Sequence, residues 1–317
     1  MPSDYIPHPA TPLRITRRVG GEFLCKKSRK IHVIFMIGYC YFSLFLLQCR
    51  SVKSRKGGAA LAIFTFQRYE KKFLISDVQA QRLIDRLLTE RDTELDTYCL
   101  GGKVYGIYNI YFDDEQNSII NTSLQRPKFK EKLRLRGYSF PETGEETVFL
   151  EIKRKIRGIV TKRRAILPYN AAMAFVCDGV RPTTDDYSAN RMLDEIEYFL
   201  GRKKLSPKVF ISYERFAMTD KLDPTLRITF DTNILTRRYD VDLAKGGGGE
   251  PLLAPDERVM EIKFPHAAPK WLCDMLTEEK VFMTHFSKYG NEYSRLRGRE
   301  LLHLDDRSRI ERKLHTC

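Results

Sequence analysis

Residues 149–167 read FLEIKRKIRGIVTKRRAIL, with apolar side chains alternating with ionic ones. Leu150 and Ile152 take turns with Glu151 and Lys153. Successive side chains of a strand point to opposite faces, so this alternation predicts two strands, 147–156 and 159–167. The intervening Arg-Gly pair at 157–158 predicts a hairpin turn. Each strand would then have one apolar face and one ionic face.

The same division of faces recurs along the chain from about residue 66. Further strands are predicted at 105–112, 131–138, 209–218, 226–235 and 258–264, with helices at 189–200 and 270–279. Ser76 followed by Gln79 is typical of a capping box, and Val78, Leu83, Ile84, Leu87 and Leu88 then recur at helical spacing. The residues of the ionic faces are Glu70, Lys72, Lys132, Arg134, Arg136, Glu151, Lys153, Lys155, Lys162, Arg164, Tyr213, Arg215, Arg227, Thr229, Asp231, Glu261 and Lys263.

Two interpretations of these ionic faces stay open. On a single strand, alternation usually means that the charged side faces water. Over all the strands together, however, the ionic faces are rich in cations, and the planar fork of Arg suits phosphate oxygens. If the apolar faces pack against outer helices, the cations line a common interior. We therefore expect an α+β fold, an antiparallel β-barrel with a charged lumen and outer helices.

The composition indicates a polyanionic partner. The chain has 317 residues, 42% of them apolar, and a formal net charge of +14. That length suits one main domain with an appendage, and the charge suits phosphate compounds, nucleic acid or an anionic membrane. The seven cysteines show no metal-ligand spacing, which predicts reduced thiols in a cytoplasmic protein and makes zinc unexpected.

The first 63 residues differ from the rest and are predicted to be an N-terminal extension. Residues 31–49 are apolar and lie between two basic stretches, near the minimum length for a membrane-spanning helix. One interpretation is a single helix that anchors the cytoplasmic domain to the inner face of a membrane, and the other is a dispensable leader. The domain that contains the expected barrel spans residues 64–300, and residues 301–317 form a charged C-terminal tail.

Isolated glutamates among the cations suggest a divalent metal. Glu70 and Glu261 are the candidate ligands, and oxygen ligands shared with phosphate favour Mg²⁺ or Mn²⁺. The alternative is that each glutamate only forms an ion pair with a neighbouring Lys or Arg. No P-loop, no kinase motif set and no Ser/His/Asp arrangement is recognisable.

An ordered series of motifs resembles the VTC domain of polyphosphate polymerases over about 66–293. The series consists of RYEKKF at 68–73, LRLR at 133–136, FLEIKRK at 149–155, TKRR at 161–164, YER at 213–215, LRITFDT at 226–232, MEIK at 260–263 and FSKY at 286–289. The family belongs to the triphosphate tunnel metalloenzymes, an antiparallel barrel decorated by helices.

The resemblance implies transfer of the γ-phosphate of ATP to a growing polyphosphate chain, with release of ADP and a Mn²⁺ or Mg²⁺ cofactor. It implies Glu261 as a metal ligand, with Glu70 as a second candidate. The implied catalytic residues are Lys72, Arg134, Arg136, Lys153, Lys162, Tyr213, Arg215, Arg227 and Lys288. Of these, Arg134, Arg136, Lys153, Lys162, Arg215 and Arg227 would contact the nucleotide.

Two alternatives remain beside the polymerase. A triphosphate hydrolase or cyclase of the same fold would use a similar interior, although its first strand more often reads E-x-E-x-K, whereas this chain has only Glu70-x-Lys72. A non-catalytic polyanion-binding module would need no Glu261. A nucleic-acid-binding module would be expected to carry aromatic side chains for base stacking among the cations of the basic faces. Tyr213 is the main candidate on those faces, so nucleic acid is not the expected partner. The sequence gives no oligomeric state.

Overall fold

The computed structural model describes residues 69–157 and 159–299, and all structural statements below concern these residues. The strands are β1 (Tyr69–Ser76), β2 (Thr93–Leu95), β3 (Tyr105–Asp113), β4 (Phe129–Gly137), β5 (Thr147–Ile156), β6 (Ile159–Pro168), β7 (Ser206–Asp220), β8 (Arg227–Arg237), β9 (Glu250–Pro251), β10 (Glu257–Phe264) and β11 (Met283–Thr284). The helices are α2 (Asp77–Thr89), the 3₁₀ helix η1 (Thr97–Gly102), α3 (Ser118–Leu124), α4 (Tyr169–Cys177), α5 (Tyr187–Gly201), α6 (Lys270–Glu278) and a last helix at 288–299.

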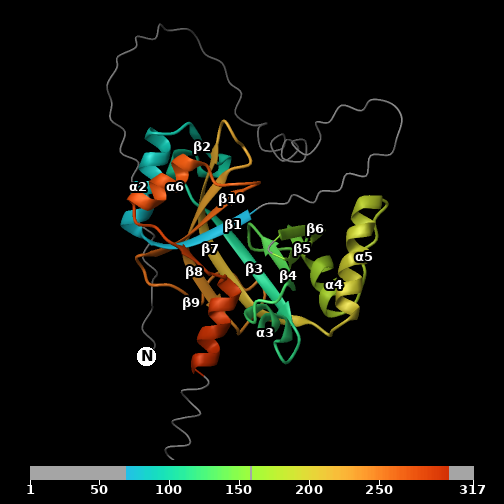
Figure 1. Cartoon of the computed structure of the whole chain (residues 1–317). Coiled ribbons are helices and arrows are strands. Elements are labelled where there is room, and N and C mark those ends of the chain that lie inside the picture. Colours follow the sequence, from blue (N-terminus) through green and yellow to red (C-terminus); the bar gives the residue numbers. More distant parts are fainter. Residues whose placement is uncertain (1–68, 158, 300–317) are drawn as a thin grey trace, which may run out of the picture. The chain divides into compact units, whose positions relative to one another are not determined.

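The strands form one large antiparallel sheet in the order β11-β1-β10-β8-β7-β3-β4-β5-β6, with β2 added to β7 and β9 to β8 (Figure 1). The hairpin at its end has the predicted register, with Glu151 opposite Arg164 and Ile156 opposite Ile159. The predicted α+β class and its antiparallel sheet are therefore confirmed.

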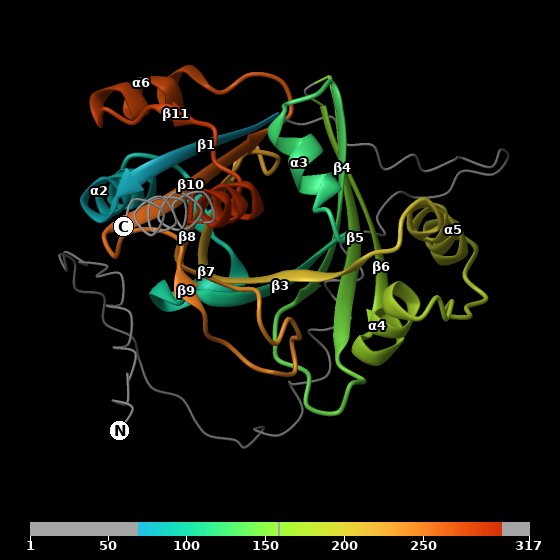
Figure 2. The same ribbon diagram turned by 90° about the horizontal axis from the view of Figure 1, so that it is seen from below.

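The sheet is not closed into a barrel by hydrogen bonds. Its described strand pairs end at β6 on one side and at β11 on the other, and β11 has only two residues. Figure 2 shows the strands curving round a shared interior, with β1 on one side and β5 and β6 on the other. Side chains join the two sides, because Lys153 Nζ on β5 donates to Glu70 Oε2 on β1 at 2.7 Å. Alternation reports where side chains point, but it does not report backbone pairing, so the expected closure is corrected to an open, curved sheet.

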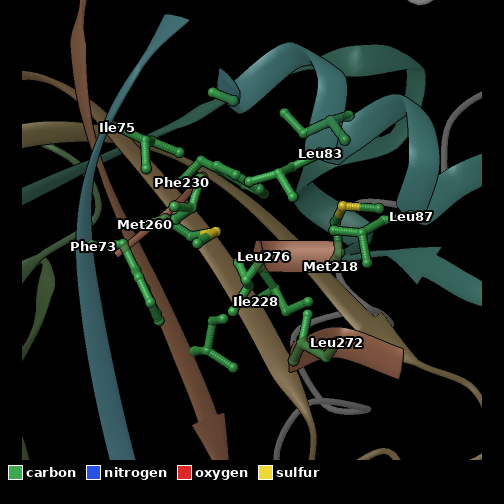
Figure 3. Packing of buried hydrophobic residues seen from close by; sticks show 14 of the residues in the cluster. Phe73, Ile75, Leu83, Leu87, Met218, Ile228, Phe230, Met260, Leu272 and Leu276 are labelled. Atoms are coloured by element: carbon green, nitrogen blue, oxygen red, sulfur yellow. The ribbon is translucent and has the colours of Figure 1, made fainter. Parts of the chain in front are cut away.

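Helix α2 forms as predicted and covers the outer face of one half of the sheet. The Ser76 hydroxyl accepts from the Gln79 amide at 3.2 Å, and Gln79 Oε1 accepts from the Ser76 amide at 3.1 Å, which completes the capping box. Leu83 and Leu87 pack with Phe73 of β1 in an apolar cluster to which β10, β8 and α6 also contribute (Figure 3). Val78 does not belong to this buried stripe, because it is exposed.

Helices α4 and α5 cover the outer face of the other half, over β4, β5 and β6 (Figure 2). Leu150 and Ile152 of β5 pack there with Phe175 of α4 and Ile196 of α5. In both halves of the sheet, the apolar face is thus turned outward and packs against helices. The ionic faces point inward and are not the solvated side of an ordinary sheet.

The last helix, 288–299, and α3 occupy part of the interior. Tyr289 and Tyr293 pack against Ile211 of β7 and Val259 of β10, and Figure 2 shows the last helix within the curve of the sheet. The Tyr289 hydroxyl donates to Asp113 Oδ2 at 3.1 Å, and the same carboxylate accepts from the first amides of α3. One end of the interior is therefore filled by an apolar cluster.

The expected extension at 1–63, its segment 31–49 and the tail at 301–317 lie outside the described residues and stay predictions. Within the ranges that the structure covers, no helix combines the length and apolar character needed to cross a membrane.

Candidate active site in the sheet interior

Most of the predicted site residues come together on the inner face of the sheet. They are Lys72 on β1, Arg134 and Arg136 on β4, Lys153 on β5, Lys162 on β6, Tyr213 and Arg215 on β7, Glu261 on β10, Glu70 on β1 and Lys288 at the start of the last helix. The inward alternation places them there, and the contacts described next link them into three groups.

The first group is built around Glu151, whose side chain is only 1% exposed. Arg134 Nε donates to Glu151 Oε2 at 3.1 Å, and Lys162 Nζ donates to Glu151 Oε1 at 3.0 Å. Burial alone would raise the pKa of this carboxyl, but the adjacent Arg134, Arg136 and Lys162 charges hold it far below its usual range. Burial and the neighbouring guanidinium groups lower the pKa of Lys162 to about 8, although Glu151 opposes this.

The second group is built around Asp231 of β8. Arg215 makes a two-pronged contact with it, Nε to Oδ1 at 2.6 Å and Nη2 to Oδ2 at 2.8 Å, and Lys288 Nζ also donates to Oδ2. Burial opposes ionisation of Asp231, yet the two cations keep its pKa well below the usual value. The Tyr213 ring lies beside both, 4.1 Å from Lys288 Nζ and 5.3 Å from the Arg215 guanidinium carbon.

The third group contains the two candidate metal ligands. Glu261 accepts from Lys263 at 2.6 Å and lies 3.3 Å from Lys72 Nζ, while Glu70 holds Lys153. Burial disfavours the charge of Glu261, but these lysines hold its pKa well below the usual value. Burial and the nearby Arg215 lower the pKa of Lys263 to about 8 against the opposing effect of Glu261.

Some interior cations have only neutral hydrogen-bond partners among the described side chains. Arg136, 9% exposed, donates through Nε to Asn109 Oδ1 at 3.0 Å and through Nη2 to the Tyr213 hydroxyl at 3.1 Å. Lys132 Nζ lies 3.4 Å from Ser287 Oγ and 5.6 Å from the Tyr289 ring. Burial and the nearby ammonium groups of Lys130 and Lys72 lower the pKa of Lys132 to about 8. The interior thus carries cationic charge that its own carboxylates do not neutralise.

Arg227 lies apart from these groups, at the rim. It donates through Nη2 to Asp96 Oδ2 at 2.7 Å and to the Tyr105 hydroxyl at 3.3 Å, and its side chain is 39% exposed. Tyr105 faces Arg215 across the β3–β7 pair, so Arg227 borders the second group without joining it.

The donor set suits Mg²⁺ or Mn²⁺, although it is small. No cluster of three or more His, Cys, Asp or Glu side chains placed for a metal occurs in the part of the chain that the structure describes. Glu70 and Glu261 lie on adjacent strands. Burial and the charge of Glu261 raise the pKa of Glu70, but Lys153 and Lys263 outweigh them, so this pKa lies below its usual value. One or two carboxylates completed by substrate phosphates is a usual ligand set for Mg²⁺. Metal would have to displace Lys72 and Lys263 from Glu261.

Several side chains that contact the predicted site residues were expected on the ionic faces of the strands but were not predicted as site residues. Glu151, Asp231, Lys132 and Lys263 all follow the same alternation, so that pattern could have identified them. Asn109 also points inward from a predicted strand and orients Arg136. Asp96, which accepts from Arg227, is the N-cap residue of η1. It lies outside the strands, so the alternation of apolar and ionic residues could not have identified it.

Fold and site together define an α+β protein with a curved antiparallel sheet and a buried, cationic inner face. The family model of the VTC domain matches residues 67–297, and the chain belongs to this family. Family membership supports an enzyme that acts on phosphate compounds. Among curated protein sequences, none matches this chain.

Solved structures give weaker likenesses. A candidate adenylate cyclase from Bacillus halodurans is 15% identical, covers 70% of this chain and 95% of its own, and has a TM-score of 0.40. A protein from Pyrococcus horikoshii is 13% identical, with coverage of 72% and 99% and a TM-score of 0.35. A candidate adenylyl cyclase from Hippeastrum, described as having a dominant triphosphatase activity, is 16% identical, with coverage of 72% and 95% and a TM-score of 0.43.

Proposed function

We propose that this protein transfers the γ-phosphate of ATP to the end of a growing polyphosphate chain and releases ADP. The observation that carries the proposal is Arg136. It is a buried guanidinium whose hydrogen-bond partners among the described residues, Asn109 and Tyr213, are both neutral. The nearby Glu151 carboxylate accepts from Arg134 and Lys162 instead. A buried charge of this kind is stabilised by an anion, and the planar fork of Arg matches phosphate oxygens. Membership of the VTC family supports the same substrate class.

The reaction needs no nucleophile from a side chain. A terminal phosphate oxygen of the acceptor attacks the γ-phosphorus, the bond from that phosphorus to the β–γ bridging oxygen breaks, and ADP leaves with this oxygen. Fixed cations stabilise the charge on the transferring group. Arg136 is oriented by two hydrogen bonds and Arg215 by the two-pronged contact with Asp231, so both are held in place before substrate enters.

The lysines of the interior would bind phosphate by exchanging partners. Lys153 and Lys162 are partly exposed and hold the carboxylates of Glu70 and Glu151. Phosphate oxygens can take over these ammonium groups. When bound at Glu70 and Glu261, a divalent ion would neutralise phosphate charge and polarise the γ-phosphate.

The apolar end of the interior favours transfer over hydrolysis. Tyr213, which lies beside the second group, belongs with Tyr289 to the apolar cluster that fills this end. Fewer waters can then reach the γ-phosphate, and the competing hydrolase reaction is disfavoured.

The test is to incubate the full chain with ATP and Mn²⁺ and to follow ADP, free phosphate and polymer. We expect polymer and ADP in equal phosphate equivalents, and loss of both in Arg136→Ala. A matched control is Arg191→Ala, which removes an exposed arginine of α5 that contacts Tyr187. Free phosphate without polymer would establish a hydrolase instead. Tight polyphosphate binding without turnover would establish a non-catalytic binding module.

A further inference from the structure

A continuous band of aromatic rings lines the rim of the interior. Tyr98 of η1 lies 5.6 Å from Tyr105 of β3, Tyr105 lies 6.3 Å from Tyr138, and Tyr138 lies 5.7 Å from Phe149 of β5, all between ring centroids. Tyr138 directly follows β4. We call these four residues the aromatic rim. It joins η1 to the neighbouring strands β3, β4 and β5 at one end of the sheet.

Two rings of the aromatic rim are exposed and the other two, Tyr105 and Phe149, are half-buried, whereas rings deeper in the interior are buried. Tyr98 is 60% exposed and Tyr138 is 47% exposed, whereas Tyr213 is only 5% exposed. Large rings usually bury most of their surface, and a contiguous group of exposed rings is typical of a binding surface. The rim therefore offers flat apolar faces that this chain itself leaves partly uncovered.

The aromatic rim adjoins the cations of the proposed phosphate site. Tyr138 lies two residues beyond Arg136 on the inner face, which is about 7 Å along a strand. Phe149 faces Arg136 in the β4–β5 register, and Tyr105 faces Arg215 in the β3–β7 register. The Arg164 guanidinium carbon lies 4.8 Å from the centre of the Phe149 ring. Planar rings thus lie at the aromatic rim, and buried guanidinium groups lie next to them inside the sheet.

We propose that the aromatic rim is a base-binding subsite for a purine nucleoside triphosphate. The base would stack on Tyr138 and its neighbours while the triphosphate reaches inward to Arg136 and Arg215. A nucleotide has a planar base separated from its phosphates by a ribose, and this order matches the order of rings and cations. Stacking of a base on an aromatic ring stabilises binding without reading the base edges. This inference rests on the proposed function, in which ATP is the phosphate donor.

The test measures the affinity of the full chain for two ligands, the β,γ-imido analogue of ATP and inorganic tripolyphosphate. Stacking of a base on one ring contributes about 1–3 kcal/mol, and the lower part of this energy range applies to a half-exposed ring such as Tyr138. Tyr138→Ala should therefore weaken binding of the analogue about 5- to 10-fold. Tripolyphosphate, which has no base, should bind unchanged. Tyr138→Phe keeps the ring and should retain wild-type affinity.

Tyr187→Ala is the matched control. Tyr187 is an exposed tyrosine of α5 that contacts Arg191, as Phe149 contacts Arg164 in the rim. It should change neither affinity. Equal losses for both ligands in Tyr138→Ala, or an unchanged affinity for the ATP analogue in that variant, would overturn the subsite.

Polymer synthesis separates this inference from the proposed function. If the wild type makes polymer but Tyr138→Ala leaves the KM for ATP unchanged, the subsite is refuted and the polymerase stands. If the wild type makes no polymer while the ligand-selective loss in Tyr138→Ala persists, the subsite stands and the polymerase is refuted.

Discussion

Replacing Glu151 by Gln tests whether the buried carboxylates partly offset the charge of the interior cations when no phosphate is bound. Gln has nearly the same shape as Glu but carries no charge. The substitution leaves Arg134 and Lys162 without the carboxylate that both now contact, at 3.1 and 3.0 Å. The cationic excess of a buried region would then increase, so the free protein should become less stable and its affinity for a polyanion should rise.

The magnitude follows from burial. Removing one partner of a buried ion pair destabilises a protein by about 3–5 kcal/mol. Glu151 is buried, but the Lys162 side chain is 30% exposed, so water compensates part of the loss and we expect about 3 kcal/mol. For a domain of this size, that lowers the melting temperature by about 6–12 °C. Tripolyphosphate at a concentration of a hundred times its Kd should stabilise the folded wild type by about 2.7 kcal/mol. At the same concentration it should stabilise Glu151→Gln by more, because the variant is expected to bind it more tightly.

The assay is thermal unfolding followed by circular dichroism, with and without tripolyphosphate. Glu195→Gln is the control, because Glu195 also contacts two arginines, Arg154 and Arg163, but its side chain is 27% exposed, against 1% for Glu151. It should cost less than about 1 kcal/mol, and tripolyphosphate should stabilise it as it does the wild type. Our reasoning is refuted if Glu151→Gln melts at the wild-type temperature, or if tripolyphosphate raises both melting temperatures equally.

Glu261→Gln should abolish Mn²⁺-dependent turnover while circular dichroism still reports a folded protein, and unchanged turnover would remove Glu261 from the metal site. Affinity for tripolyphosphate should fall as the pH rises from 7 to 9.5, because burial lowers the pKa of Lys132, Lys162 and Lys263 to about 8 and only the ammonium form binds phosphate. Binding above pH 8 should therefore take up protons, measurable by calorimetry in two buffers of different ionisation enthalpy, and a flat profile would contradict this. Ser76→Ala removes the N-cap of α2 and should lower stability by about 1 kcal/mol without changing activity, so an unchanged melting temperature would argue against the capping box.

Local sequence signals identified the elements that carry them. The alternation in 147–167 predicted the β5–β6 hairpin within one residue of its end, and Ser76 with Gln79 predicted the start of α2. Helices α3 and α4 were not predicted. Their N-cap residues, Asn117 and Pro168, form no side-chain capping hydrogen bond, and the carboxylate that accepts from the first amides of α3 belongs to Asp113, four residues before its N-cap. Helix α4 thus begins without the polar residue from which a helix boundary is usually read, and α3 is capped from outside the usual spacing.

Residue order alone establishes that each strand has an apolar and an ionic face, because successive side chains of a strand point to opposite sides. The three-dimensional arrangement of the strands brings the ionic faces to one interior and selects which charges meet there. Lys153 contacts Glu70 across 83 residues of sequence, and Lys288 contacts Asp231 across 57. Such pairs depend on the curvature of the sheet and on the last helix entering its interior. The open edge between β6 and β11 was likewise decided by backbone hydrogen bonding, which side-chain alternation does not report.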